Sequence, residues 1–306
     1  MQIPYYPGCT LKAKAMALEQ STLEAAALLD LELTEIPDWT CCGAAYPLNY
    51  DRMANLVPLI RLITHVRDSG ANALTTTCSF CFNSLRRANY AMRHDPLVRR
   101  RVNSYLHDDF AHRDYEPDPA PYQEYAGELK VLHLLEVLRD SVGFNEIRYA
   151  VHRELSHVHA APYYGCMLLR PAAELELDDP EFPTILSEFL LGCSCGCVEF
   201  PLMNECCGSY VGVSQPESSL NPVYRVLTAA RLAGANAIVT TCPLCFYNLD
   251  HHQRELIERF QSFQPLPVVY FTQLLGLALG VPAEHLGFDE HLVDPRPLLL
   301  EKEVTV

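Results

Sequence analysis

Thirteen cysteines give this 306-residue chain its most distinctive chemistry. Ten of them form two sets with the same order: one cysteine, then an adjacent pair followed by glycine, then Cys-x-x-Cys. The first set is Cys9, Cys41, Cys42, Cys78 and Cys81, and the second is Cys166, Cys206, Cys207, Cys242 and Cys245. Adjacent cysteines rarely form ordinary structural disulfides, and the N-terminus shows neither region of an export signal. We therefore expect a cytoplasmic protein whose thiols are reduced and bind metal.

Five thiols per set is one more than a tetrahedral zinc ion or a cubane iron–sulfur cluster uses. An adjacent pair could instead bridge or flank the irons of a more open cluster. Soft thiolates suit iron–sulfur, zinc and copper(I), so the ligands are better determined than the metal. Gly43 and Gly208, which follow the adjacent pairs, would let the backbone pass close to a cluster. Two multi-iron sites are the first expectation, and a structural zinc in one half is the alternative.

The segments that must position these thiols are doubled as well. The segment "YYPGCTLK" (5–12) matches "YYGCMLLR" (163–170), and "TCCGAAY" (40–46) matches "ECCGSYV" (205–211). A third pair is "GANALTTTCSFCFNSL" (70–85) and "GANAIVTTCPLCFYNL" (234–249). Because the order is the same in both halves, we predict two homologous domains at 1–150 and 151–306, the second with a C-terminal extension.

Strand patterns alternate with helix patterns between the matched segments. Extended stretches at 3–7, 33–37 and 71–77 have counterparts at 159–165, 198–202 and 235–241, and helical spacing fills the intervals. This alternation predicts α/β units with mostly parallel strands. The carboxyl ends of such strands share one edge of the sheet, so each set of cysteines is expected there. The helix after each Cys-x-x-Cys would direct its positive end toward the thiolates.

The order Cys, Cys-Cys-Gly, Cys-x-x-Cys resembles the cysteine-rich CCG domain. Two copies in a chain of this length resemble the two-CCG-domain iron–sulfur subunit of heterodisulfide reductase. The likeness covers about residues 1 to 282 and includes "APYYGCMLLRP" (161–171), "CPLCFYNLD" (242–250) and "VVYFTQLLGLALG" (268–280).

This resemblance implies an oxidoreductase that acts on a sulfur group. Each set of five cysteines would hold a noncubane [4Fe-4S] cluster, so all ten would take part in catalysis through the clusters. A disulfide, either the coenzyme M–coenzyme B heterodisulfide or a related sulfur species, would be cleaved between the two clusters. Electrons would come from a flavin-containing subunit through a small ferredoxin-like iron–sulfur subunit. The alternatives are an electron-transfer subunit of a succinate or fumarate:quinone reductase, or of a lactate- or glycolate-oxidising complex.

Several other residues could be either structural or functional. Cys193, Cys195 and Cys197 alternate along one segment and are not counted as ligands. They could be small buried residues, a reserve metal or redox site, or oxidation-sensitive surface thiols. The tyrosine pairs Tyr5–Tyr6 and Tyr163–Tyr164 either pack beside a cluster or line a substrate cleft. His133 is expected to be a core histidine rather than an acid catalyst, and Arg170 could neutralise an anionic substrate.

The composition excludes some classes of function. The net charge is −15, and no cluster of Lys or Arg could follow a phosphate backbone, so nucleic-acid binding is not expected. The apolar stretch 265–282 is interrupted by Thr272 and Gln273, which predicts a buried strand and a core helix rather than a membrane span. A Pro-rich acidic loop is expected at 112–128, and a surface extension after Gly287.

Overall fold

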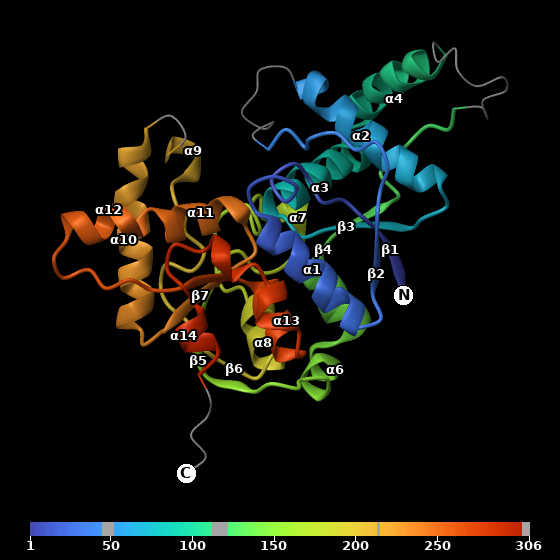
Figure 1. Ribbon diagram of the computed structural model, residues 1–306. Coiled ribbons are helices and arrows are strands. Elements are labelled where there is room, and N and C mark those ends of the chain that lie inside the picture. The colour runs from blue at the N-terminus through green and yellow to red at the C-terminus, as the bar shows by residue number, and fades with distance from the viewer. Residues whose placement is uncertain (45–51, 112–121, 213–214, 302–306) are drawn as a thin grey trace.

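The computed structural model describes residues 1–44, 52–111, 122–212 and 215–301, and it contains two four-stranded sheets (Figure 1). Their strand orders are β2-β1-β3-β4 and β6-β5-β7-β8, and every pairing between these strands is parallel. The strands are β1 (Gln2–Tyr5), β2 (Glu32–Glu35), β3 (Ala73–Thr76), β4 (Lys130–His133), β5 (Leu155–Tyr163), β6 (Cys195–Cys197), β7 (Ala237–Thr240) and β8 (Val268–Tyr270). The predicted doubled α/β fold is therefore confirmed.

Helices connect the strands and cover both sheets. In the first half they are α1 (Met16–Leu28), α2 (Arg52–Asp68), α3 (Ser79–His94), α4 (Pro96–Ala111), α5 (Leu134–Val137), the π-helix η2 (Leu138–Val142) and α6 (Phe144–Tyr149). In the second half they are α7 (Ala172–Leu175), α8 (Ile185–Gly192), α9 (Ser209–Gly212), α10 (Pro216–Leu232), α11 (Pro243–His251), α12 (Gln253–Arg259) and α13 (Phe271–Ala278). The C-terminal part adds the 3-10 helices η3 (Ala283–His285) and η4 (Phe288–Glu290), and α14 (Arg296–Leu299).

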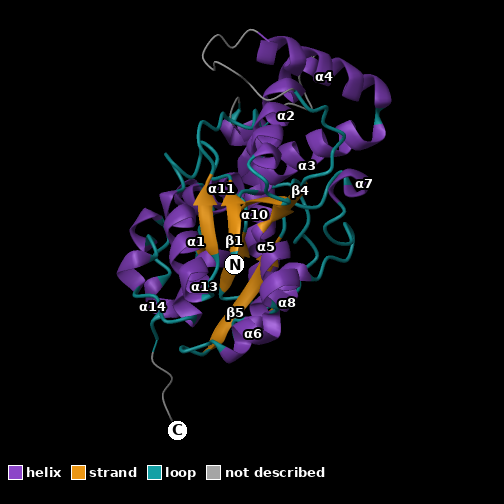
Figure 2. Ribbon diagram, turned by 90° about the vertical axis from the view of Figure 1, so that its right-hand side faces the viewer, coloured by secondary structure: helices purple, strands orange, loops and turns teal. Residues whose placement is uncertain are grey.

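The two halves exchange the helices that follow their last strands. Helix α13 of the second half packs on α1 of the first, and α5 and α6 of the first half pack on α8 of the second. In Figure 2, α1 and α13 lie on one side of the strands and α5 and α8 on the other. The buried hydroxyls of Ser21 and Thr272 join α1 to α13 with a 2.7 Å hydrogen bond. Because helices pack across residue 150, the domain boundary there stays a proposal.

The strand register shows which tyrosines are equivalent. Tyr163 on β5 pairs with Thr240, whereas Tyr5 on β1 pairs with Thr75, the residue before the counterpart of Thr240. Tyr163 therefore corresponds to Tyr6, and Tyr5 corresponds to Pro162. The sequence comparison of the two tyrosine pairs was wrong by one residue, because "YYPGC" has a proline that "YYGC" lacks.

One predicted strand lies in a different place. The extended segment expected at 198–202 is not a strand, and β6 occupies Cys195–Cys197 instead. There it pairs with His159 and Ala160 of β5. Gly196 allows this close approach, since a Cβ on it would lie 3.0 Å from the His159 ring. Residues 201–204 form a turn that leads to the adjacent cysteine pair.

The expected surface extension after Gly287 is instead part of the packed structure. Phe288 and Leu299 are buried, and Gly287 lies against Ala17 of α1. The buried Asp250 carboxylate accepts hydrogen bonds from the backbone of residues 292 and 293 at 2.6 and 3.2 Å. The strand and core helix predicted within 265–282 are confirmed as β8 and α13. Most of the Pro-rich loop, residues 112–121, lies outside the described residues.

Candidate metal centres

All ten cysteines of the two sets lie beyond the carboxyl ends of parallel strands. Cys9 and Cys166 follow β1 and β5, and the adjacent pairs follow β2 and β6. Cys78 and Cys242 are the N-cap residues of α3 and α11, whose first turns carry Cys81 and Cys245. The structure therefore puts each set at one sheet edge with a helix N-terminus pointing into it, as predicted.

The five sulfurs of each set form an open chain in the same order. In the first set, Cys9 Sγ lies 3.4 Å from Cys41 Sγ, and Cys42 Sγ lies 3.4 Å from Cys81 Sγ. Thiol hydrogen bonds join Cys41 to Cys42 and Cys81 to Cys78, which completes the chain.

The second set repeats this arrangement. The Sγ atoms of Cys207 and Cys245 are 3.5 Å apart, and hydrogen bonds join Cys166 to Cys206, Cys206 to Cys207 and Cys245 to Cys242. Among the residues that the structure describes, no three His, Cys, Asp or Glu side chains converge as a site for one metal ion. Each set is an extended row of sulfur donors.

Glycine before the first cysteine of each set makes room for these sulfurs. Gly8 has φ +76°, and a Cβ there would lie 2.6 Å from Cys81 Sγ. Gly165 has φ +62°, and its Cβ would lie 3.0 Å from Cys245 Sγ. Sequence reasoning missed this pair of glycines, although each directly precedes a cysteine in matched segments. Gly43 and Gly208 also have positive φ values of 72° and 85°, so the turn after each adjacent pair favours glycine.

A tyrosine hydroxyl holds each Cys-Cys-Gly segment against the sheet. Tyr6 donates a 2.7 Å hydrogen bond to the carbonyl oxygen of Thr40, the residue before Cys41. Tyr163 donates an equivalent 2.7 Å bond to the carbonyl oxygen of Glu205, the residue before Cys206. Both rings are fully buried. These buried tyrosines therefore hold the backbone before each cysteine pair, in agreement with the alternative that they pack beside a cluster.

Hydrogen bonds within each set lower the pKa of one thiol and raise the pKa of its bonded neighbours. Hydrogen bonds from Cys41 and Cys81 lower the pKa of Cys42, and the same bonds raise the pKa values of Cys41 and Cys81. In the second set, the hydrogen bond from Cys166 lowers the pKa of Cys206 and raises that of Cys166. Each set therefore stabilises a thiolate, which is the form that binds metals.

One side of each set faces solvent and the other faces the core. Cys9, Cys41 and Cys206 are exposed and Cys166 is partly buried, whereas the remaining six cysteines are buried. The exposed thiols come from the loops after the strands, and the two Cys-x-x-Cys segments lie inside. Each set is therefore open to solvent on the side of the loops that follow the strands.

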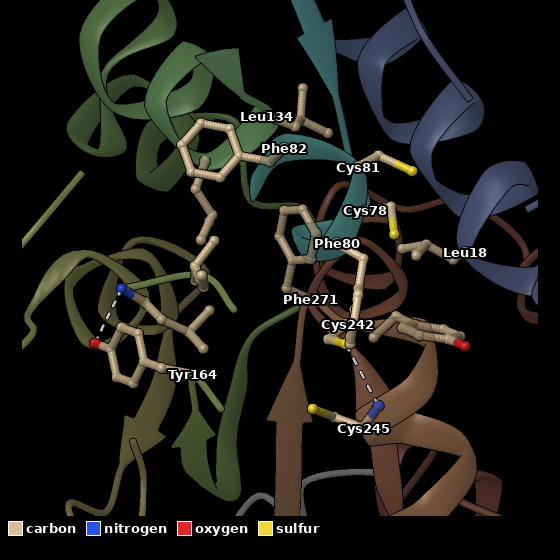
Figure 3. Close-up of a cluster of buried hydrophobic side chains, with 14 of the residues drawn as sticks. Leu18, Cys78, Phe80, Cys81, Phe82, Leu134, Tyr164, Cys242, Cys245 and Phe271 are labelled. Carbon is tan, nitrogen blue, oxygen red and sulfur yellow. Dashed lines mark hydrogen bonds between the residues drawn. The ribbon is translucent and has the colours of Figure 1, made fainter. Parts of the chain in front are cut away.

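The two sets meet at their Cys-x-x-Cys segments. Ser79, which follows Cys78, hydrogen-bonds through its hydroxyl to the hydroxyl of Thr241, which precedes Cys242, at 2.7 Å. Both residues are fully buried. Figure 3 shows the thiols of Cys78 and Cys81 in the same part of the core as those of Cys242 and Cys245. The sequence could not predict this contact, which joins sites 162 residues apart.

An asymmetric group of side chains also crosses between the sets. The rings of Phe80 and Tyr210 are 5.5 Å apart, and the Tyr210 hydroxyl lies 3.9 Å from Met167 Sδ. Asn83, directly beyond Cys81 and Phe82, donates 2.8 Å hydrogen bonds to the carbonyl oxygens of Met167 and Arg170. The corresponding position of Phe80 is Leu244, and that of Met167 is Thr10. Sequence reasoning did not single out these residues.

Two further predictions can be compared with the structure. His133 is fully buried, accepts a hydrogen bond from Leu135 N at 3.1 Å and contacts the Thr77 carbonyl oxygen at 3.0 Å. Burial lowers its pKa to about 3, so it is a neutral core histidine, as expected. The Arg170 guanidinium is bonded to the carbonyl oxygens of Asn204 and Pro180, so it fixes the loop before the second cysteine pair.

The three additional cysteines lie apart from the second set. Cys193 and Cys195 are buried, and Cys197 is partly buried on β6. Burial raises the pKa values of all three thiols. The surface-thiol alternative is therefore wrong for Cys193 and Cys195, and the structure agrees with small buried residues.

No helix within the described parts of the chain is both long and apolar enough to span a bilayer.

Comparison with known proteins gives related sequences over almost the whole length. The chain is 30% identical to the 8-methylmenaquinol:fumarate reductase membrane anchor subunit of Wolinella succinogenes, over 97% of this chain and 99% of that protein. It is 27% identical to the B-type subunit of a ferredoxin/F420H2-dependent CoB–CoM heterodisulfide reductase of Methanosarcina acetivorans, over 95% and 94% of the two chains.

The fold also recurs in a solved structure. A hypothetical protein from Helicobacter pylori superimposes with a TM-score of 0.72 at 11% sequence identity, over 95% of this chain and 51% of that chain. At this identity the likeness concerns the fold alone. The sequence pattern of the CCG cysteine-rich domain matches residues 3–86 and 160–250, which contain both sets of cysteines. This chain therefore belongs to the family of proteins built from the cysteine-rich CCG domain.

Proposed function

We propose that this chain is the disulfide-cleaving subunit of a heterodisulfide reductase-type complex. Each set of five cysteines would hold one noncubane [4Fe-4S] cluster. The substrate would be the coenzyme M–coenzyme B heterodisulfide or a related disulfide or sulfur species. The observation that carries this proposal is that two complete sets adjoin, because Ser79, next to Cys78, and Thr241, next to Cys242, share a 2.7 Å hydrogen bond. A disulfide has two sulfurs, and two facing sites can each take one.

The residues present fit an iron–sulfur group. Each set offers five soft sulfur donors, and each stabilises a thiolate. The Sγ atoms lie 3.4 to 3.5 Å apart in the pairs Cys9–Cys41, Cys42–Cys81 and Cys207–Cys245. Gly8 and Gly165 leave space beside the sulfurs that a methyl group would fill. Clusters bound there would supply electrons one at a time and favour the thiolate form of a bound sulfur.

The chain's own residues would shape the region between the two sites. Phe80, Tyr210 and Met167 offer two aromatic rings and a thioether, which are polarisable groups that pack well against sulfur. Asn83 fixes the backbone at Met167 and Arg170. We infer that these side chains position the disulfide and limit access of water to it.

A second candidate function is electron transfer in a quinol-linked reductase. The relative from Wolinella succinogenes, named as a subunit of an 8-methylmenaquinol:fumarate reductase, matches over nearly its entire length. In that case the two sets would carry electrons between partner subunits and would not bind a disulfide. Both functions require iron in the chain, and only the first requires a sulfur substrate.

Metal analysis tests the cofactor. Protein purified without oxygen should hold about eight iron atoms and eight acid-labile sulfides per chain, from the stoichiometry of two [4Fe-4S] clusters. About four irons with one zinc would support the zinc alternative for one half. Protein purified under these conditions without iron would contradict the proposal.

Activity distinguishes the two functions. With a reduced viologen as electron donor, the loaded chain should reduce the coenzyme M–coenzyme B heterodisulfide or a simpler mixed disulfide. Cys207→Ser should abolish this activity, whereas Cys195→Ala, at a buried position of strand β6, serves as the matched control and should retain it. If a methylmenaquinol analogue reduces the loaded chain and the chain reduces no disulfide, the second function is favoured.

Partners can be tested by co-purification. We expect a ferredoxin-like iron–sulfur subunit and a flavin-containing subunit to accompany the chain from its own cells. The exposed thiols Cys9, Cys41 and Cys206 mark the faces from which electrons would enter. A succinate dehydrogenase-type flavoprotein in the same complex would instead support the quinol-linked function.

A further inference from the structure

Two buried side chains beside the second set place their polar atoms near one sulfur. The Ser209 hydroxyl oxygen lies 3.4 Å from Cys207 Sγ, and Asn248 Nδ2 lies 3.8 Å from the same sulfur. Asn248 Nδ2 also donates a 3.1 Å hydrogen bond to the carbonyl oxygen of Cys207. Cys207 is 1% exposed, Ser209 6% and Asn248 3%. These contacts are therefore shielded from water, where a hydrogen bond has a larger electrostatic effect than at the surface.

Two helices of the second half fix these side chains. Asn248 lies three residues after Cys245 on α11, so the two side chains share one helix face. Cys245 Sγ is itself 3.5 Å from Cys207 Sγ, which directs this face of α11 toward Cys207. Ser209 begins α9 directly after Gly208, whose φ of +85° turns the chain at this point. Because α9 packs on α11, the two donors reach Cys207 from separate elements.

The direction of these hydrogen bonds follows from the chemistry of the sulfur. The Cys207 thiol can donate its proton to the Ser209 hydroxyl oxygen. A metal-bound sulfur has lost this proton, and the hydroxyl, which can either donate or accept, then becomes the donor. The Asn248 amide nitrogen has two N–H groups, one for the Cys207 carbonyl oxygen and one for the sulfur. Both side chains can therefore donate to the same metal-bound sulfur.

Hydrogen bonds to a ligand sulfur change how readily an iron–sulfur site accepts an electron. One-electron reduction breaks no bond and adds negative charge, which the ligand sulfurs share. A donor beside such a sulfur stabilises the reduced state more than the oxidised state, so it raises the reduction potential. The buried position of Cys207 should strengthen this effect.

The first half has different side chains at the same positions. In the matched segments, Ala44 stands where the second half has Ser209, and Ser84 stands where it has Asn248. Ala44 has no side-chain donor, and its backbone N–H and the Ser84 hydroxyl are bonded to Cys42 instead. The Ser84 hydroxyl also lies 3.5 Å from the Ala44 carbonyl oxygen. In each half, therefore, the buried second member of the adjacent pair is the sulfur beside these donors.

We propose that Ser209 and Asn248 are positioning residues that raise the reduction potential of the second site through hydrogen bonds to Cys207 Sγ. This inference rests on the iron–sulfur cofactor of the proposed function and does not depend on the disulfide substrate. The electron comes from a partner subunit or, in an assay, from a chemical reductant such as dithionite. Both side chains contact a ligand and not the reacting atoms, so they act through Cys207.

A redox titration of the loaded protein, followed by EPR spectroscopy, tests this role. Ser209→Ala removes the hydroxyl, and Asn248→Ala removes the amide. Each variant should lower one of the two reduction potentials of the chain, with an equilibrium constant for reduction about tenfold smaller, which corresponds to about 59 mV for one electron. The potential of the first site should not move, so it serves as an internal reference.

Ser218→Ala is the matched control and should leave both potentials unchanged. Ser218 lies on α10 in the same half, and its exposed hydroxyl donates to Gln215 Oε1 at 3.2 Å. A purely structural role of Ser209 would lower the urea midpoint of Ser209→Ala but leave its potentials equal to those of Ser218→Ala, which would overturn the proposal. An equal shift of both potentials would also overturn it. So would loss of iron from both Ser209→Ala and Asn248→Ala, because these side chains would then be needed to hold the cluster.

This measurement is independent of disulfide turnover. A chain that shows the expected shift but reduces no disulfide would refute the disulfide-cleaving function and support this inference. A chain that reduces a disulfide, with potentials unchanged in both variants, would refute this inference and leave the disulfide-cleaving function in place.

Discussion

Replacing Gly8 with alanine would test whether the space beside the first set of sulfurs is needed for iron. Two costs are expected from the structure. The first is backbone strain, because Gly8 has φ +76° and a left-handed conformation costs an L-residue about 1–2 kcal/mol. The second is a collision, because the new Cβ would lie 2.6 Å from Cys81 Sγ. Ordinary contacts of this kind begin at 3.4 Å, so the sulfur would have to move by 3.4 − 2.6 = 0.8 Å.

Such a movement is large for a metal ligand. Distances between a metal and its ligands are normally held within about 0.2 Å, so the displaced sulfur could not keep its place. We expect Gly8→Ala to lose the iron of the first set, about half of the total. The equivalent change Gly165→Ala needs a movement of only 3.4 − 3.0 = 0.4 Å and should lose less iron.

Alanine variants of two other glycines separate the effect of backbone strain from that of the collision with the sulfur. Gly70 and Gly234 have φ values of +88° and +99°, and neither has an atom within 4 Å of an added Cβ. Their alanine variants should lose about 1–2 kcal/mol of unfolding free energy from backbone strain and keep all their iron. The assays are urea denaturation and measurement of iron and labile sulfide on anaerobic protein. The reasoning is refuted if Gly8→Ala binds as much iron as Gly70→Ala.

Three further predictions follow from the hydrogen bonds, the buried histidine and the extra cysteines. Tyr163→Phe should lose about 1 kcal/mol in urea denaturation, because it removes the 2.7 Å bond to Glu205; an unchanged midpoint would contradict this role. His133 has a folded-state pKa of about 3 against 6.5 when exposed, so the unfolded chain binds more protons in this range. Its contribution to stability is therefore complete above pH 6.5 and falls by about 1.4 kcal/mol per pH unit between pH 6.5 and about pH 3. His133→Gln should reduce that slope, and equal slopes would show that the histidine does not titrate on unfolding. Cys195→Ala should keep the full iron content, and loss of iron in this variant would show that β6 contributes a ligand.

Local patterns predicted most of the fold. The alternation of apolar strands with amphipathic helices is a short-range property, so it indicated the α/β class and the position of each cysteine at a strand end. The strand at 198–202 was predicted wrongly because its apolar residues fit an extended segment, whereas pairing with β5 selects Cys195–Cys197. The segment after Gly287 looked like a tail because its attachment to Asp250 is a long-range contact.

The candidate sites were predicted in composition but not in arrangement. Spacing alone grouped the ten cysteines into two sets of five, since strand ends in one sheet must share an edge. The supporting residues were harder to find. Gly8 and Gly165 are needed because an added Cβ would collide with the sulfur of a cysteine more than seventy residues away in the chain. Tyr6 is needed because its hydroxyl bonds to the carbonyl oxygen of Thr40. Such pairs have no local signal in a single sequence.

The presence of two copies of one cysteine-bearing α/β unit can be inferred from the amino-acid sequence. Repetition, strand and helix periodicity, and ligand spacing are all patterns of neighbouring residues. How the two copies meet is visible only in the folded chain. The exchange of α13 and α5 between the halves, the contact of Ser79 with Thr241 and the one-sided contact of Phe80 with Tyr210 depend on which surfaces pack together. Packing is a property of the whole chain, because it depends on which apolar surfaces can be buried together, and this is why two similar sequence repeats become two unequal sites.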